Sequence, residues 1–144
     1  MIPVVIGLFG LVIGSFLNVL IHRVPLRRSI VRPSSSCPHC GAYIKALDNI
    51  PVLSYLLLRG RCRECEGRIS PRYPLVEVLT GVLFALAAYE FGLSLALVWA
   101  LVLISALVAL AGIDLEHRLL PNVVVGPAAL VGFALSAAGD PGRW

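Results

Sequence analysis

Three long apolar stretches constrain the fold of this chain more than any other feature. They cover residues 2–21, 73–91 and 93–113, and a shorter fourth stretch covers residues 122–138. Because a helix rises about 1.5 Å per residue, about 20 apolar residues cross the roughly 30 Å hydrocarbon core of a bilayer. The composition agrees, with 58% hydrophobic residues, 14% charged residues and a mean hydropathy of +0.90. The sequence therefore predicts an all-α integral membrane protein with about four transmembrane helices in a lipid bilayer.

The basic residues indicate how the chain is oriented in the membrane. Ten of the twelve Lys and Arg residues lie in the loop of residues 22–72. Positive charge in short loops marks the cytoplasmic side. We therefore expect this loop and residues 114–121 to be cytoplasmic, and the N-terminus to lie outside. No Lys or Arg precedes Ile2, so the first stretch lacks the basic region of a signal peptide and is expected to be retained. The net charge of +4 follows from this clustering and does not indicate nucleic-acid binding.

Four cysteines form two C-x2-C pairs within the basic loop. They are Cys37, Cys40, Cys62 and Cys65. Two such pairs supply the four thiolates of a closed, structural zinc site. The alternative is two disulfides, which a reducing cytoplasm disfavours. Gly41 and Gly67 follow the pairs closely, where tight turns direct backbone N–H groups toward sulfur. We therefore expect residues 37–72, the cysteine module, to be organised by a structural zinc ion.

A short helix is predicted inside the cysteine module. Residues 48–51 read Asp-Asn-Ile-Pro, in which Asp48 or Asn49 can cap a helix and proline suits its first turn. The helix should cover residues 52–59 and end at Gly60. Its apolar run is too short to cross a bilayer. It either packs under the module or lies on the membrane surface.

Glycines and a short turn predict how the long helices pack. Gly10 and Gly14 are four positions apart, so they share one helix face and allow close approach of a second helix. Only residues 90–92 separate the second and third apolar stretches. These two helices should therefore form an antiparallel hairpin.

Two acids close to helix ends are candidate functional groups. Glu77 lies about one turn inside the second apolar stretch, where an acid is costly and usually faces the bundle interior. The alternative is an interfacial residue that reaches the headgroups. Asp114 follows the third stretch with no helix breaker before it, so we expect it on the last turn of that helix or just past it. A lone aspartate at this place also fits a cap or an interfacial anchor.

Several segments together closely resemble the bacterial type IV prepilin peptidases, over nearly the whole chain. Besides the two cysteine pairs, the segments are residues 14–19 (GSFLNV), 48–55 (DNIPVLSY), 59–62 (RGRC), 69–77 (ISPRYPLVE) and 113–121 (IDLEHRLLP).

The resemblance implies an activity, a methyl donor and a location. It implies an aspartic endopeptidase of the bacterial inner membrane that cleaves the leader of type IV prepilins and type II secretion pseudopilins. The same enzymes N-methylate the new N-terminus with S-adenosylmethionine, through their N-terminal cytoplasmic part. We nominate Glu77 as the group that accepts a proton from the pilin amine. Some members of the family lack the cysteines, so cleavage does not require zinc in general.

The family uses two aspartates at cytoplasmic helix ends, and this sequence matches the first of them. Asp114 is the match, and the second belongs to a Gly-x-Gly-Asp motif that this sequence does not contain. One carboxyl must be ionised and the other protonated, so a single aspartate cannot do both jobs. Asp140 lacks the first glycine of the motif. The fourth span would also place it outside, about 25–30 Å from Asp114.

These considerations give an expected domain organisation. Residues 1–22 form the first transmembrane helix, residues 23–72 the cytoplasmic zinc module, and residues 73–144 the start of the peptidase core. We expect this chain to be an N-terminal portion, inactive as a peptidase by itself. The second hypothesis is a zinc-stabilised, membrane-anchored binding or regulatory fragment without catalysis. A transporter subunit is disfavoured, because four spans with one acid offer no evident ion pathway.

Overall fold

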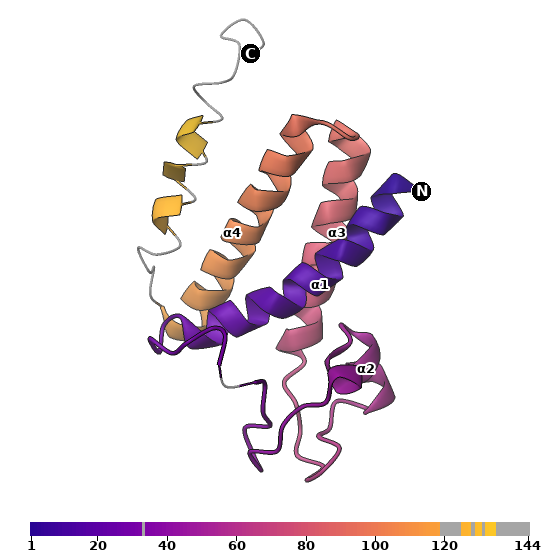
Figure 1. The fold of residues 1–144 in the computed structure, drawn as a ribbon, viewed down its shortest axis with the longest axis vertical. Helices are drawn as coiled ribbons and strands as arrows, with labels where there is room; N and C mark the ends of the chain where they lie inside the picture. Colours follow the sequence, from indigo (N-terminus) through magenta and orange to yellow (C-terminus); the bar gives the residue numbers. More distant parts are fainter. Residues whose placement is uncertain (33, 119–124, 128, 131, 135–144) are drawn as a thin grey trace, which may run out of the picture.

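Three long helices dominate the structure. The computed structural model describes residues 1–32, 34–118, 125–127, 129–130 and 132–134 (Figure 1). The long helices are α1 (Ile2–Arg23), α3 (Arg72–Phe91) and α4 (Leu95–His117). Each is long and apolar enough to cross a membrane, which confirms the first three predicted spans. The predicted fourth span lies largely outside the described residues. Between α1 and α3 the described residues form two short helices and two isolated β-bridges, so the all-α prediction is confirmed.

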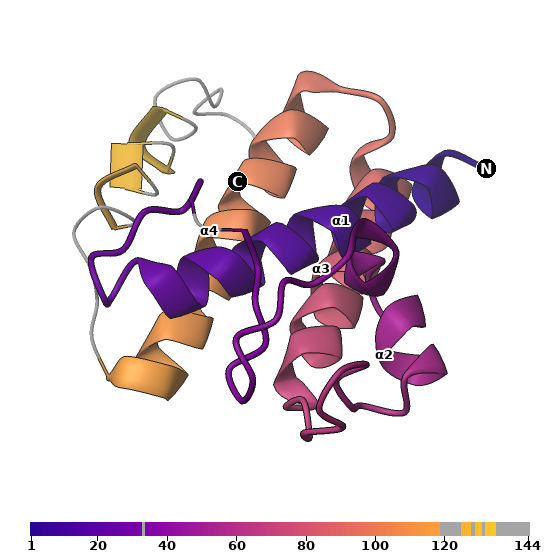
Figure 2. The ribbon, with the colours of Figure 1, turned by 60° about the horizontal axis from the view of Figure 1, so that its bottom comes forward.

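Helix α1 crosses α3 through a face of small residues (Figures 1 and 2). A Cβ atom on Gly10 would lie 2.8 Å from the Cα of Gly81, and one on Gly14 would lie 2.6 Å from the Cα of Glu77. Real Cβ atoms do not approach other atoms this closely, so both positions require glycine. The predicted role of Gly10 and Gly14 is confirmed, and Glu77 is held directly against α1.

Helices α3 and α4 form the predicted antiparallel hairpin (Figure 1). Gly92 makes the turn with a φ of +57°, a conformation that suits glycine. Ser94 then caps α4 by accepting a hydrogen bond from the Leu97 N–H at 3.3 Å. At the other end, Ile113 of α4 is completely buried beside Ile21 of α1. The three helices therefore share one apolar core.

The cysteine module lies at one end of the helix bundle, which we call the loop-side end. This end contains the last turn of α1, the first turn of α3 and the last turn of α4 (Figure 1). Within the module, η1 is a 3-10 helix over Ala46–Asn49, and α2 is an α-helix over Leu53–Leu57.

The predicted module helix is shorter than expected, and neither Asp48 nor Asn49 caps it, because it has no side-chain cap. Val52, at a φ of +60°, lies outside the helical region, so α2 begins at Leu53. Arg59 and Gly60 both have positive φ, and α2 ends before them at Leu57. Asp48 does not cap α2, because its carboxylate is bound by Arg63 instead, with Arg63 Nε 2.9 Å from Asp48 Oδ2.

Candidate functional site

The four cysteines converge on one point. Their sulfur atoms all lie within 4.8 Å of one another. The Sγ atoms of Cys37 and Cys65 are 3.8 Å apart, and those of Cys40 and Cys62 are 4.0 Å apart. Four thiolates arranged tetrahedrally at the Zn–S distance of about 2.3 Å are separated by about 3.8 Å. The donor set and its spacing therefore fit a tetrahedral metal ion held by four thiolates.

The two cysteine pairs are built in the same way. The N–H of Cys37 donates to the carbonyl of Ala42 at 2.9 Å, and the N–H of Cys62 donates to the carbonyl of Gly67 at 2.9 Å. In each pair the residue after the second cysteine has positive φ, Gly41 at +72° and Glu66 at +56°. Two local turns thus present their sulfurs to each other.

Glycine is needed at position 67 because the His39 ring and the Cys65 sulfur pack closely against its Cα, and not because of its backbone φ angle. A Cβ atom there would lie 2.8 Å from the His39 ring and 3.2 Å from the Cys65 Sγ. His39 itself bridges the two pairs, with its Nε2 3.1 Å from the Arg68 carbonyl oxygen. His39 therefore lies across the junction between the two knuckles and does not point its Nε2 at the cluster.

The sulfurs differ in acidity within this cluster. The backbone N–H groups of Cys40 and His39 lower the pKa of Cys37 to about 6. The Gly67 N–H lowers the pKa of Cys65, but burial and the neighbouring sulfurs outweigh it and raise that pKa to about 12. Closely spaced thiolates repel one another, so a bound cation is what allows the whole set to ionise.

Glu77 joins the cysteine module to the long helices. The side chain extends from α3, is only 8% exposed, and its Oε2 accepts a hydrogen bond from the Val52 N–H at 2.7 Å. Ser15 of α1 lines the same cavity as this carboxylate. The acid is thus buried between α3 and the cysteine module.

A large cavity opens beside Glu77, between the loop-side end of α1 and the cysteine module. Its volume is about 710 Å³, and Asn18, His22, Tyr73 and Glu77 are among the residues that line it. This volume lies within the range of about 300–1,000 Å³ that is typical of small-molecule and cofactor sites. The cavity therefore has room for a ligand beside a buried carboxylate.

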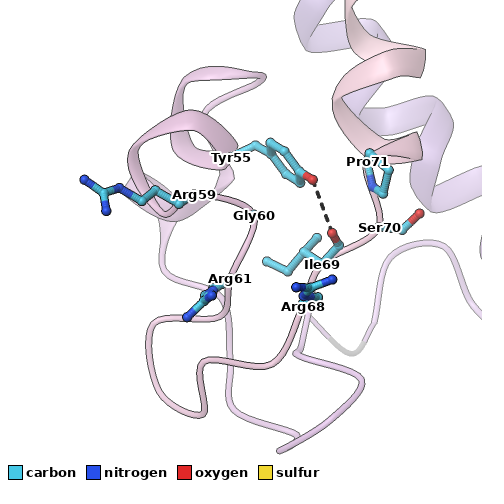
Figure 3. Close-up of a pocket in the computed structure, with 8 residues that line it drawn as sticks. All are labelled: Tyr55, Arg59, Gly60, Arg61, Arg68, Ile69, Ser70 and Pro71. Atoms are coloured by element: carbon cyan, nitrogen blue, oxygen red, sulfur yellow. Dashed lines mark hydrogen bonds between the residues drawn. The ribbon is translucent and has the colours of Figure 1, made fainter.

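A second hollow of about 560 Å³ lies between α2 and residues 68–71 (Figure 3). Tyr55 of α2 turns into it, and its hydroxyl donates to the Ile69 carbonyl at 3.4 Å. A Cβ atom on Gly60 would lie 2.8 Å from this hydroxyl, so glycine is needed there as well. Three arginines surround the hollow, Arg59, Arg61 and Arg68.

Asp114 lies on the last turn of α4, on the face opposite the packed core. Its neighbours Gly112 and Ile113 are buried, whereas Asp114 is exposed. Leu107 and Ala111 are also exposed and lie on the same helix face, because they precede Asp114 at helical spacing. The described part of the chain therefore leaves the Asp114 carboxyl free on an uncovered face. Asp140 lies outside the described residues.

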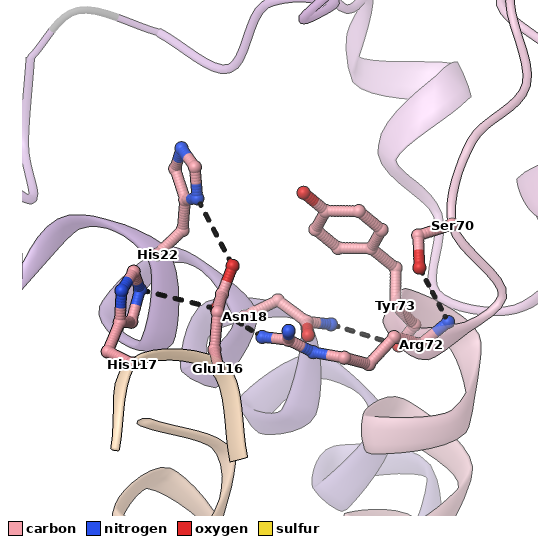
Figure 4. A network of polar contacts seen from close by, with 7 residues as sticks. All are labelled: Asn18, His22, Ser70, Arg72, Tyr73, Glu116 and His117. Carbon is pink, nitrogen blue, oxygen red and sulfur yellow. Dashed lines mark hydrogen bonds and ion pairs between the residues drawn. The ribbon is translucent and has the colours of Figure 1, made fainter. Parts of the chain in front are cut away.

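Sequence reasoning missed a polar network at the loop-side end of the helix bundle (Figure 4). Glu116 of α4 accepts a hydrogen bond from the Arg72 guanidinium of α3. Its carboxylate also lies 3.8 Å from His22 Nδ1 of α1 and 3.6 Å from His117 Nε2. The predicted membrane topology could have indicated this network, because each of these residues lies at the loop-side end of a predicted span. Glu116 thus ties together the ends of the three long helices.

Comparisons with known proteins identify relatives of this chain. The family model described as the Bacterial Peptidase A24 N-terminal domain matches residues 8–91. A Myxococcus xanthus protein named prepilin leader peptidase/N-methyltransferase is 57% identical over 127 residues, which is 88% of this chain and 38% of that protein. A Legionella pneumophila protein of the same name is 42% identical, covering 82% of this chain and 49% of its own length.

An Escherichia coli relative has a different name, "Type 4 prepilin-like proteins leader peptide-processing enzyme". It is 44% identical, over 84% of this chain and 52% of its own length. The chain thus spans about half the length, or less, of these curated relatives. No solved structure matches the chain significantly. On the family match over residues 8–91, the chain belongs to the bacterial prepilin peptidase family.

Proposed function

We propose that this chain is part of a membrane aspartic endopeptidase that cleaves the leaders of type IV prepilins and type II secretion pseudopilins, and that N-methylates the trimmed products. The observation that carries the proposal is the free carboxyl of Asp114, exposed at the loop-side end of α4 on a face that the described helices leave uncovered. The names of the relatives, prepilin leader peptidase/N-methyltransferase, support the substrate class.

In the proposed cleavage, Asp114 works with a second carboxyl that approaches its free helix face. Two carboxyls in contact share one proton, because like charges at short range cannot both ionise. The ionised member takes a proton from water, which attacks the scissile carbonyl, while the protonated member polarises that carbonyl. The second carboxyl comes from chain that packs on the face of Leu107 and Ala111, and Asp140 is not its source.

The cleavage proposal is tested in cells that lack their own prepilin peptidase. The 144-residue chain is expressed alone, or together with the remaining segment of the Myxococcus xanthus relative, and prepilin processing is followed by gel mobility. We expect no cleavage by the chain alone and cleavage by the pair. Asp114→Asn should lower the rate of the pair by at least about 10²–10⁴-fold, the range of general acid–base catalysis. Asp48→Asn, which changes a carboxylate in the cysteine module, is the matched control.

Two results would contradict the proposal. The first is processing by the 144-residue chain alone, and the second is an unchanged rate with Asp114→Asn. If no pairing restores cleavage, the alternative of a membrane-anchored binding fragment without catalysis gains support.

For methyl transfer we propose the cavity beside Glu77 as the site. S-adenosylmethionine supplies an electrophilic methyl group there, and the cavity volume of about 710 Å³ accommodates a molecule of that size. With the cofactor bound there, the Glu77 carboxylate would accept the proton that the pilin amine loses as it takes the methyl group, and the demethylated cofactor would leave as a neutral thioether. Glu77 supports this role by its burial and by its position on the cavity wall.

Two substitutions separate catalysis by Glu77 from its anchoring of Val52. Glu77→Gln keeps an oxygen that can accept the Val52 N–H bond but removes the proton acceptor, whereas Glu77→Ala removes both. We expect Glu77→Gln in the paired enzyme to lower methylation by at least about 100-fold while prepilin cleavage continues. Full methylation by Glu77→Gln, with loss only in Glu77→Ala, would show that the residue is an anchor.

We also propose that the cysteine module faces the cytoplasm and binds zinc. The ten basic residues of the loop support this orientation through the positive-inside rule. The four-thiolate donor set and its spacing support zinc. The ion is structural, because four thiolates leave no open coordination position. The division into residues 1–22, 23–72 and 73–144 is part of the same proposal.

A further inference from the structure

We propose that α2 is an interfacial anchor, whose exposed leucines enter the loop-side leaflet of the bilayer while neighbouring arginines contact anionic lipid headgroups. The leucines are Leu53, Leu56 and Leu57, and the arginines are Arg59 and Arg61. The proposal requires only that α1 and α3 span a membrane. It does not depend on peptidase or methyltransferase activity.

The first argument is the height of α2 relative to the long helices. The Val52 N–H, just before α2, is hydrogen bonded to Glu77 Oε2 at 2.7 Å. Glu77 is about 7.5 Å along the axis of α3 from Arg72, the charged residue that begins this helix. Interfacial helices lie about 5–10 Å into the boundary between headgroups and acyl chains. Because side chains lean toward the N-terminus of their helix, Val52 lies between the levels of Glu77 and Arg72. If Arg72 lies at the headgroups, the start of α2 lies at the boundary between headgroups and acyl chains and not in bulk water.

The second argument is the exposed face of α2. Leu53, Leu56 and Leu57 are 49%, 65% and 75% exposed. Tyr55 takes the opposite direction and binds Ile69 inside the module. These three leucines therefore do not pack into the module, whereas Tyr55 does. In the described part of the chain no residue buries these leucines. At this depth the lipid acyl chains would contact them.

The third argument is the charge that borders the leucines. Figure 3 shows Arg59 at the end of α2, with its guanidinium extended away from the hollow that Tyr55 enters. Arg61 follows within the same turn region and has an exposed side chain. Arginine stems can lie along apolar surface while their charged ends reach headgroup phosphates. Leucines bordered by arginines match an anionic bilayer surface better than they match an apolar protein surface.

Depth-dependent fluorescence quenching tests the proposal on the full chain in vesicles. Trp99→Phe and Trp144→Phe remove the native tryptophans, and Leu57→Trp adds a reporter on α2. Tyr43→Trp reports an exposed position in the cysteine module, and Leu86→Trp reports the exposed side of α3 within the span. The vesicles contain phosphatidylglycerol and lipids brominated on their acyl chains.

We expect bromine to quench Leu57→Trp at least about threefold more strongly than Tyr43→Trp, and to approach the quenching of Leu86→Trp. Leu56→Trp serves as the second reporter if Leu57→Trp does not assemble. Replacing Arg59 and Arg61 together by Gln, or omitting phosphatidylglycerol, should reduce the quenching of Leu57→Trp by about twofold.

Three outcomes would overturn the proposal or part of it. Quenching of Leu57→Trp by aqueous acrylamide, as strong as that of Tyr43→Trp, would show that α2 lies in water. Protection from both acrylamide and bromine would show that protein covers the leucines, either further chain or a second copy. If the quenching of Leu57→Trp changes neither with the arginine substitutions nor with omission of the anionic lipid, the proposed contact between the arginines and the headgroups is wrong.

Discussion

At the scale of single residues, the cysteine cluster shows how local backbone geometry prepares a set of ligands. The two pairs have the same turn, yet their sulfurs differ in acidity. Cys37 receives backbone N–H groups and has a pKa of about 6, whereas Cys65 is surrounded by other sulfurs and has a pKa of about 12. At neutral pH Cys37 is therefore mainly ionised, and Cys65 keeps its proton until a cation displaces it.

This difference predicts how zinc affinity depends on pH. Zinc binding must release the proton of Cys65, so the apparent affinity should rise with pH between about 6 and 8, and protons should be released on binding. Competition with a chromophoric chelator at several pH values, with an indicator dye for protons, measures both. Cys65→Ser should lower the affinity by more than about 100-fold. An affinity that is independent of pH would contradict the expected order of ionisation.

At the scale of helices, the closest packing is that of α1 on α3. We expect Gly14→Ala to lower the free energy of unfolding by about 1–3 kcal/mol, because its Cβ would overlap the backbone of α3 at Glu77. Gly7→Ala is the matched control, since its Cβ would lie 3.1 Å from the Cβ of Ala85, which is tight but less severe. Unfolding in mixed micelles measures the difference. Equal effects of the two substitutions would show that the helices separate freely at Gly14.

The loop-side ends of the helices are held by the Glu116 network. Glu116→Gln keeps the size of the side chain but removes the charge that Arg72 and His22 face. We expect backbone amides in the last turn of α4 to exchange about tenfold faster, which corresponds to about 1.4 kcal/mol. Glu90→Gln, at the opposite end of α3, should leave this exchange unchanged. The same exchange rates in both variants would mean that Glu116 does not hold the helix end that carries Asp114.

At the scale of the whole molecule, the structure consists of an apolar three-helix unit and a polar module organised around sulfur. Among the described residues, the buried acid Glu77 joins the two parts by accepting a hydrogen bond from the Val52 N–H. We expect zinc chelation to loosen the cysteine module while leaving α1, α3 and α4 intact, because their core contains no sulfur ligand.

Hydrogen exchange before and after chelation measures this separation. Residues 37–71 should lose protection by at least about tenfold, and residues 76–88 should keep theirs. Loss of protection in both regions would show one cooperative unit instead of two. Zinc readdition should restore the module, which distinguishes metal loss from irreversible oxidation of the cysteines.

The sequence by itself determined the elements of this protein and the identity of its candidate metal ligands. Apolar stretches of about 20 residues are local patterns, and a continuous stretch of this length crosses a bilayer as a helix, which satisfies its own backbone hydrogen bonds. The cysteine pairs are local as well, because each C-x2-C turn is closed by hydrogen bonds between near neighbours in the chain. Close packing at Gly10 and Gly14 followed from helical spacing alone.

Only the tertiary structure decided the partners of the charged side chains. Glu77 meets Val52 across 25 positions, and Arg72 meets Glu116 across 44. No periodicity encodes such pairs, because they depend on the angle at which α1 and α4 pack against α3. The same packing buries Ile113 and turns the adjacent Asp114 outward, since neighbours on a helix point about 100° apart. The sequence thus placed the acid at a helix end, and the packing of the three helices left its carboxyl free.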